Sequence, residues 1–144
     1  MAPRFRYNGP MRSRLLLILW LLGILFPMAY LGTRWPVFGH LFNATFAADW
    51  VHVVMHSFLY TVLGILLMRW VKPTSIQSSL LILGLGLLVG CCHEGLQILT
   101  AGHWPGWPAE TVDLGVDLAG TAIGLILSWI WIYHKGHSPL RLLR

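Results

Sequence analysis

Four long apolar segments constrain the fold of this chain more than any other feature. They lie near residues 14–32, 49–71, 76–100 and 112–133, and each reaches the roughly 20 residues that a helix needs to cross a bilayer. Because the backbone must satisfy its own hydrogen bonds in lipid, such segments fold as helices. The sequence therefore predicts an all-α, polytopic transmembrane helical bundle of about four spans, built as a single membrane domain over residues 1–144.

The composition agrees with this interpretation. The chain is 56% hydrophobic and 10% charged, whereas a soluble domain carries about 25% charged residues. Its net charge of +5 would suit a nucleic-acid-binding protein, but the charges lie at the chain ends and between the apolar segments, where lipid headgroups meet them. We therefore expect membrane lipids as partners and no nucleic acid. Cys91 and Cys92 lie inside an apolar segment, which favours buried free thiols.

The distribution of lysine and arginine predicts the orientation of the spans. Positive side chains favour the cytoplasmic side of a membrane. If the spans cross the membrane in turn, one side of it receives only Arg34 and the other side receives all the remaining lysines and arginines. The side that carries Arg34 is therefore expected to be the outer one. Both termini and the 72–75 turn are then cytoplasmic, and the expected location is the bacterial inner membrane. The residues on the cytoplasmic side are Arg4, Arg6, Arg12, Arg14, Arg69, Lys72, Lys135, Arg141 and Arg144.

Polar side chains that lipid disfavours fall on one stripe of each of the last three spans. A carboxylate at mid-helix costs about 2.5–3.5 kcal/mol on insertion scales, so we expect these stripes to face one another. Their depth predicts one polar cluster in the outer half of the bundle, opening outward, beneath the loop that follows the third span. The residues expected in this cluster are Asp49, His52, His56, Tyr60, Glu94, Gln97, His103, Asp113 and Asp117.

Small residues recur on the same faces of the third and fourth spans. Gly86-x-x-x-Gly90 and Gly120-x-x-x-Gly124 have the spacing that lets two helix backbones approach closely. These four glycines are therefore predicted to be helix-packing residues.

Three kinds of chemistry remain open for the cluster. The first is a hydrogen-bonded network that fixes helix packing. The second is a binding site for a polar or cationic ligand or a lipid headgroup. The third is a centre of metal-dependent or acid–base catalysis. His52-x-x-x-His56 places two imidazoles on one face, but the glutamate of a zinc-binding H-E-x-x-H helix is missing between them. His93-Glu94 lacks a second histidine three residues later. No catalytic residue, metal ligand or cofactor is therefore predicted, and a conventional enzyme is not expected.

Three motifs follow one another along these spans: Asp49-Trp-Val-His52 with Tyr60, then Glu94-Gly-Leu-Gln97, then Asp113-x-x-x-Asp117-x-x-Gly120-x-x-x-Gly124. They resemble, in order, the D-x-x-H, E-x-x-Q and D-x-x-x-N-x-x-G-x-x-x-G motifs of the VanZ-like membrane family. The resemblance runs from about residue 45 to residue 130. Where the family often has Lys, Arg and Asn, this chain has Trp50, His103 and Asp117, so that cations are lost and a carboxylate is gained.

The resemblance implies a role in the cell envelope, near outer-leaflet lipids or cell-wall precursors. The family takes its name from a determinant of low-level resistance to lipid-tailed glycopeptide antibiotics. We therefore expect the outward cluster to bind a lipid or an envelope-related ligand. The alternative is an accessory subunit of a larger membrane complex, gripped through the basic tails 1–12 and 135–144, in which the cluster only fixes helix packing.

Overall fold

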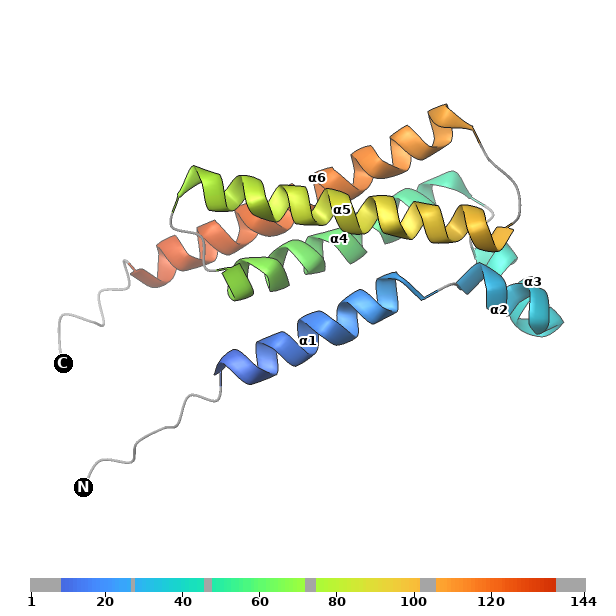
Figure 1. The fold of residues 1–144 in the computed structure, drawn as a ribbon, viewed down its shortest axis with the longest axis horizontal. Coiled ribbons are helices and arrows are strands. Elements are labelled where there is room, and N and C mark those ends of the chain that lie inside the picture. Colours follow the sequence, from blue (N-terminus) through green and yellow to red (C-terminus); the bar gives the residue numbers. More distant parts are fainter. Residues whose placement is uncertain (1–8, 27, 46–47, 72–74, 102–105, 137–144) are drawn as a thin grey trace, which may run out of the picture.

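The computed structural model describes residues 9–26, 28–45, 48–71, 75–101 and 106–136. Within these ranges the chain forms six helices and no strand, so the expected all-α class is confirmed. Four of the helices lie side by side along the length of the molecule, and two short ones cap one end (Figure 1). In chain order the helices are α1 (Gly9–Ile24), α2 (Met28–Arg34), α3 (Pro36–Thr45), α4 (Asp49–Val71), α5 (Ile76–Ala101) and α6 (Trp107–Gly136).

Three helices are long and apolar enough to cross a membrane. Their candidate spans are Trp50–Val71, Ile76–Thr100 and Glu110–His134, close to the predicted segments 49–71, 76–100 and 112–133. The described residues therefore form an α-helical fold in which three helices could span a membrane. The bounds agree because each segment is mostly apolar and is bordered by turn-forming or polar residues.

The prediction of a fourth span over residues 14–32 is wrong. The helix breaks: α1 ends at Ile24 and α2 begins at Met28. With 16 residues, α1 is about 24 Å long, shorter than the roughly 30 Å hydrocarbon core of a bilayer. Position 27 is a proline, which has no N–H to continue the ladder and whose ring clashes with the carbonyl four residues earlier. Between the first two predicted segments the chain also contains α3.

The apolar core lies where α1 and α5 pack against α4. The indole N–H of Trp20 on α1 donates to the carbonyl of Leu59 on α4 over 2.9 Å, and the Trp20 ring meets Phe58 edge-on with centroids 6.1 Å apart. In lipid, such interhelical hydrogen bonds and close packing hold helices together, because burial from water no longer drives association. The buried apolar residues are Leu17, Ile24, Tyr60, Leu63, Leu66, Leu67, Met68 and Ile82.

Helices α4 and α6 run in the same direction and approach closely at glycines (Figure 1). A Cβ at Gly120 would lie 2.8 Å from the carbonyl oxygen of Ser57, and one at Gly124 would collide with the carbonyl oxygen of Thr61. Neither position accepts a side chain without separation of the two backbones. The predicted Gly120-x-x-x-Gly124 pair thus lies at the α4–α6 contact.

The glycines of α5 lie against side chains of α6. A Cβ at Gly86 would be 2.5 Å from Oγ1 of Thr121, and one at Gly90 would be 3.0 Å from Oδ2 of Asp117. A further glycine that the sequence did not single out, Gly64 of α4, faces the carbonyl oxygen of Thr121 at 2.5 Å. Glycines of both α4 and α5 therefore make room for α6.

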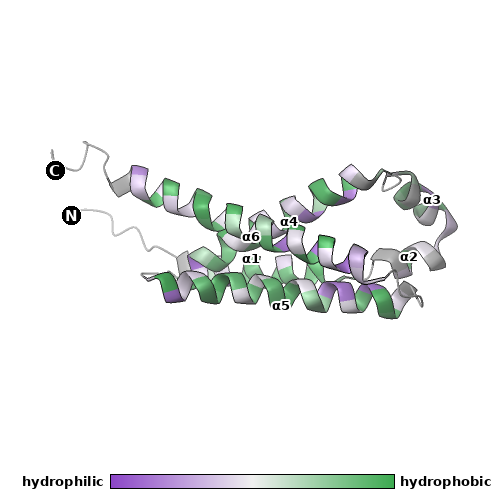
Figure 2. Ribbon diagram, turned by 90° about the horizontal axis from the view of Figure 1, so that it is seen from above, coloured by the Kyte–Doolittle hydropathy of each residue, from purple (hydrophilic) through white to green (hydrophobic). Residues whose placement is uncertain are grey.

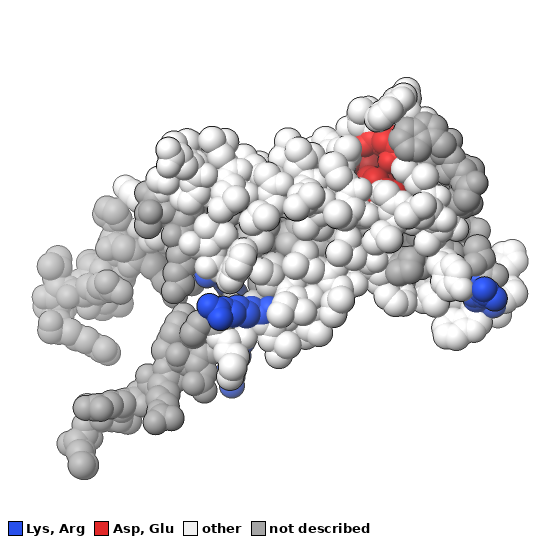
Figure 3. Space-filling view, in the orientation of Figure 1, with Lys and Arg blue, Asp and Glu red and all other residues white. Residues whose placement is uncertain are grey.

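Charge and polarity are unevenly distributed along the molecule. Helix α1 begins and α6 ends at one end, while α4 and α6 begin and α5 ends at the other (Figure 1). In Figure 2 the hydrophilic residues of α5 lie in its first turn and in the half that ends at Ala101, with apolar residues between them. Figure 3 shows an acidic patch at the end where α6 begins, and basic side chains mainly toward the opposite end. Both cysteines are free but exposed on the outer surface of α5, so their predicted burial is wrong.

Candidate functional site

Two histidine–carboxylate pairs link α4 to α6. Nε2 of His52 lies 3.4 Å from Oδ1 of Asp113, and Nδ1 of His56 lies 2.8 Å from Oδ1 of Asp117. Both pairs have the same separation of 61 residues along the chain. Because α4 and α6 are parallel, one turn along α4 matches one turn along α6, and the i, i+4 spacing on each helix places both pairs in register.

Helix α5 completes the site from the other side. Oε1 of Glu94 lies 3.9 Å from Nδ1 of His56 and 3.9 Å from Nδ1 of His93. The His93 ring stacks on the His56 ring with centroids 5.2 Å apart, and its Nε2 lies 3.2 Å from the side-chain amide of Gln97. Three helices therefore supply one constellation, here called the carboxylate–histidine cluster: His52, His56, His93, Glu94, Asp113 and Asp117.

Burial divides the cluster into an outer and an inner layer. The side chains of His52 and Asp113 are 34% and 20% exposed, whereas Asp117 is 0%, His56 4% and Glu94 5% exposed. The outer pair lies one turn nearer the end at which α4 and α6 begin. The cluster thus opens toward that end and closes toward the middle of the bundle.

Several polar atoms of the inner layer have no hydrogen-bond partner among the described residues. They are buried, yet nothing in the described chain satisfies them. Such atoms destabilise a protein interior by about 1–3 kcal/mol each, and native structures contain few of them. The atoms are the hydroxyl of Tyr60, Nδ1 of His93, Oε1 of Glu94 and Oδ2 of Asp117.

The lysine and arginine positions of α4, α5 and α6 are far along the helices from the buried carboxylates. Helix α5 contains neither lysine nor arginine, and those of α4 and α6 are Arg69 and Lys135. Along their helices these lie about 20 Å from His56 and about 27 Å from Asp117, at 1.5 Å per residue. Among the ion pairs of the described residues, the carboxylates meet imidazoles alone. Within the described part of the chain, the carboxylates of the site are therefore paired with groups that carry a positive charge only when protonated.

Most of the site residues predicted from the sequence lie together in the structure. His52, His56, Tyr60, Glu94, Gln97, Asp113 and Asp117 all belong to the facing surfaces of α4, α5 and α6. Asp49 begins α4, but its side chain is outside the described part of the chain, as is all of His103.

The sequence analysis missed His93 as a member of the site. Its position was readable, because steps of three or four residues from Gly90 reach both His93 and Glu94 on the same face of a helix. Glu110 is also buried, at 6% exposure, in the first turn of α6.

Four inner residues have the composition of a metal centre. His56, His93, Glu94 and Asp117 each present a ligand atom, and these atoms all lie within 4.8 Å of one another. The sequence predicted no metal ligand, because the residues come from three helices and form no contiguous motif. Two imidazoles and two carboxylates can hold a cation.

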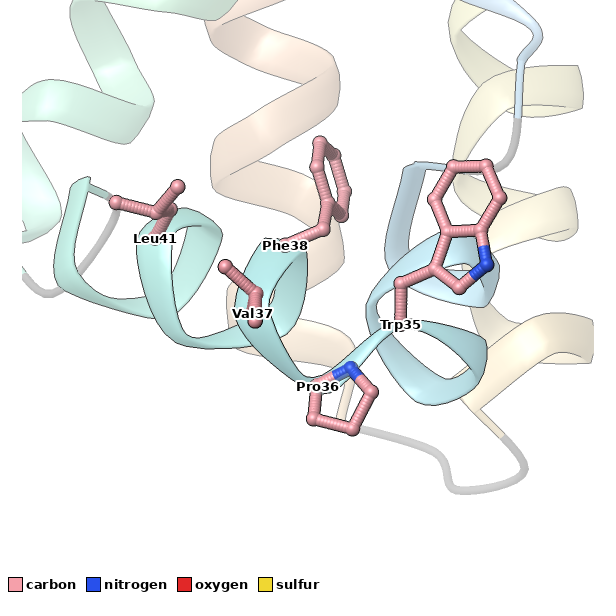
Figure 4. Close-up of a pocket in the computed structure, with 5 residues that line it drawn as sticks. All are labelled: Trp35, Pro36, Val37, Phe38 and Leu41. Carbon is pink, nitrogen blue, oxygen red and sulfur yellow. The ribbon is translucent and has the colours of Figure 1, made fainter.

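A separate pocket lies at the α2–α3 corner. It encloses about 440 Å³ and is lined by apolar groups (Figure 4). Such a lining offers contact area for apolar chains and no group for acid–base or ligand chemistry. The lining residues are Trp35, Pro36, Val37, Phe38 and Leu41. The candidate site is therefore the carboxylate–histidine cluster.

Comparison of the chain with protein-family models, curated proteins and solved structures gives no match. The resemblance to the VanZ-like family stays a prediction, and the functional argument depends on the geometry of the cluster.

Proposed function

We propose that this chain is a VanZ-like integral membrane protein of the bacterial cell envelope that binds a positively charged ligand in its carboxylate–histidine cluster. One observation carries the proposal: Glu94 and Asp117 are buried together, each has an oxygen without a hydrogen-bond partner among the described residues, and their ion pairs there are with histidine. Burying a charge is costly unless it is paired. A cation placed between these oxygens supplies the missing partner.

A purely structural network explains the geometry less well. In a structural network every buried polar group forms hydrogen bonds with its neighbours. A network with missing hydrogen bonds leaves the protein less stable than an apolar core would. Here the His56–Asp117 hydrogen bond is made, but Oε1 of Glu94 and Oδ2 of Asp117 make none with the described residues. The unused acceptors favour a ligand over a packing device.

The proposed setting follows from the charge distribution of the sequence. Basic residues concentrate at one end of the spans, which suits the cytoplasmic side. The cluster then opens toward the outer side of the inner membrane, through His52 and Asp113. The ligand chemistry is a positive charge, which the ammonium headgroup of an envelope lipid and a free cation both offer.

The test is ligand-dependent stability of the full chain in lipid nanodiscs. Thermal unfolding is measured in phosphatidylglycerol alone, with phosphatidylethanolamine added, and with NaCl, CaCl2 or ZnCl2, for the unchanged protein and for Glu94→Gln. A ligand that binds only the folded state stabilises it by about 2.7 kcal/mol at a hundred times its Kd. We expect one class of probe to stabilise the unchanged protein and to lose most of that effect in Glu94→Gln. Gly84→Ala on the same helix, where a Cβ would meet nothing within 4 Å, is the matched control.

Without ligand, Glu94→Gln is expected to be as stable as the unchanged protein or more stable. The substitution loses no hydrogen bond of Oε1 and removes a carboxylate whose charge is costly to bury. The proposal fails if Glu94→Gln destabilises the ligand-free protein and no probe loses its stabilising effect in that variant. The cluster would then serve only to pack the helices. The accessory-subunit alternative would then be the one to pursue.

A further inference from the structure

The inner layer of the cluster brings four metal-ligating side chains to one point. His56 comes from α4, His93 and Glu94 from α5, and Asp117 from α6. Their ligand atoms all lie within 4.8 Å of one another. A tetrahedral zinc site has metal–ligand bonds of about 2.0–2.2 Å and so needs ligand atoms about 3.4 Å apart. The most widely separated ligand atoms must therefore approach by up to about 1.4 Å when the ion binds.

The orientation of the groups fits a shared ion. Nδ1 of His56 and Nδ1 of His93 both face Oε1 of Glu94, at 3.9 Å each. Nδ1 of His56 also faces Oδ1 of Asp117 at 2.8 Å. Nδ1 of His93, Oε1 of Glu94 and Oδ2 of Asp117 are buried with no hydrogen-bond partner in the described chain. Polar atoms of all four residues therefore border the same space. Nδ1 of His56 is shared with Asp117, and the other three atoms have no hydrogen-bond partner in the described chain.

The charges of the site also match a divalent ion. Two carboxylates carry two negative charges, and imidazoles bind metals in their neutral form. A divalent cation therefore makes the site neutral overall. That balance matters in a span, where uncompensated charge is costly and where the basic residues of α4 and α6, Arg69 and Lys135, lie several turns away.

We propose that His56, His93, Glu94 and Asp117 bind a divalent transition-metal ion of the zinc class. This inference depends on the proposed function and specifies the ligand of that same site. Imidazole nitrogens favour zinc, cobalt, iron and nickel over magnesium and calcium, which take oxygen ligands. Four protein ligands also fill a tetrahedral site, which is the pattern of a structural or storage centre.

Neighbouring residues supply the support that a metal site needs. The side-chain amide of Gln97 lies 3.2 Å from Nε2 of His93. In the structure the amide nitrogen of Gln97 faces this ring nitrogen and donates to it. On metal binding the amide must turn over, so that its oxygen accepts the Nε2 proton and the Nδ1 lone pair is left for the metal, as with outer partners of metal-bound histidines. Gly90 lets Asp117 approach α5, since a Cβ there would lie 3.0 Å from Oδ2. His52 and Asp113, which are partly exposed, lie between the surface and these four residues.

The test measures metal directly in the full chain, purified without a histidine tag in mild detergent. The variant Cys91→Ser/Cys92→Ser serves as the background, because the two exposed thiols would bind metal adventitiously. We expect one zinc ion per chain by elemental analysis, and Co²⁺ added to the metal-free protein should give the intense visible absorption of a four-coordinate nitrogen–oxygen site. Asp117→Asn and His93→Gln should each weaken Co²⁺ binding by more than the roughly 10–100-fold loss expected of Gln97→Leu.

Outcomes separate this inference from the proposed function. Substoichiometric metal, or metal that His93→Gln and Asp117→Asn retain, overturns the zinc site. If an ammonium headgroup or a monovalent cation still stabilises the protein through Glu94, the broader function stands. Should the variants fail to fold, X-ray absorption of the zinc-loaded background protein decides: two imidazoles with oxygen ligands support the site, and fewer imidazoles refute it.

Discussion

The contact of Gly124 with the α4 backbone gives a sharp packing prediction. In Gly124→Ala the new Cβ would collide with the carbonyl oxygen of Thr61 and lie 3.1 Å from Cα of Gly64. Carbon atoms in contact are about 3.5–4.0 Å apart, so α4 and α6 must separate by at least about 0.5 Å. Gly115→Ala on the same helix is the matched control, because nothing lies within 4 Å of a Cβ there.

The size of the effect follows from the gap that the methyl group opens. A separation of about 0.5–1 Å forfeits a quarter to a half of the dispersion energy of each contact across it. A buried leucine-sized side chain makes about 40–60 contacts worth about 0.1–0.2 kcal/mol each, so each one that faces α6 loses about 1 kcal/mol or more. With two or three such side chains, Gly124→Ala should be about 2–3 kcal/mol less stable than Gly115→Ala. The gain in helix propensity from glycine to alanine is common to both variants and cancels.

The assay is reversible unfolding in mixed micelles of rising SDS fraction, followed by far-ultraviolet circular dichroism. The free energies of unfolding of the two variants are compared under identical conditions. If Gly124→Ala and Gly115→Ala unfold within about 0.5 kcal/mol of each other, the glycine does not set the α4–α6 distance, and the packing argument fails. Such a result would also remove the reason for the close approach of Asp117 to α4.

Two further substitutions probe the site and the docking of α1. Gly90→Ala should weaken Co²⁺ binding about 10–100-fold, because the new methyl group would crowd Oδ2 of Asp117. Gly84→Ala, where a Cβ meets nothing within 4 Å, should leave the Co²⁺ titration unchanged. Equal Co²⁺ affinities of the two variants would contradict this prediction. Trp20→Phe removes the indole donor to the Leu59 carbonyl and should lower the free energy of unfolding by about 0.6–1 kcal/mol in the same SDS assay. An unchanged free energy would show that this hydrogen bond does not hold α1 on α4.

The three long helices were predictable because length and apolar content decide them locally. The segments 49–71 and 76–100 differ from α4 (Asp49–Val71) and α5 (Ile76–Ala101) by at most one residue. The first span was mispredicted for an equally local reason: apolar content continues through Pro27, but the backbone hydrogen bonds of a helix do not. Hydropathy measures the solvent that side chains prefer, and it is insensitive to a missing N–H.

The site was predictable in its membership and less so in its partners. Helical periodicity placed one polar stripe on each span, and the cost of polar groups in lipid made convergence of the stripes the economical arrangement. Periodicity does not say which imidazole meets which carboxylate. That pairing depends on the direction and register of α4 and α6, which put His56 opposite Asp117 and His52 opposite Asp113. His93 was overlooked since it lies at the edge of its stripe.

The glycines and the acidic residues of α6 both lie where α6 packs against α4, so both bear on the distance between these two helices. Gly120 and Gly124 bring α6 against the α4 carbonyls, and one to two turns away Asp117 meets His56 at 2.8 Å. The backbone contact therefore holds the two helices together without help from the polar pair. A helix pair already joined by glycines does not need buried carboxylates as an adhesive, and each one costs about 2.5–3.5 kcal/mol to insert. Their presence is better explained by a ligand that the glycines allow α4, α5 and α6 to enclose.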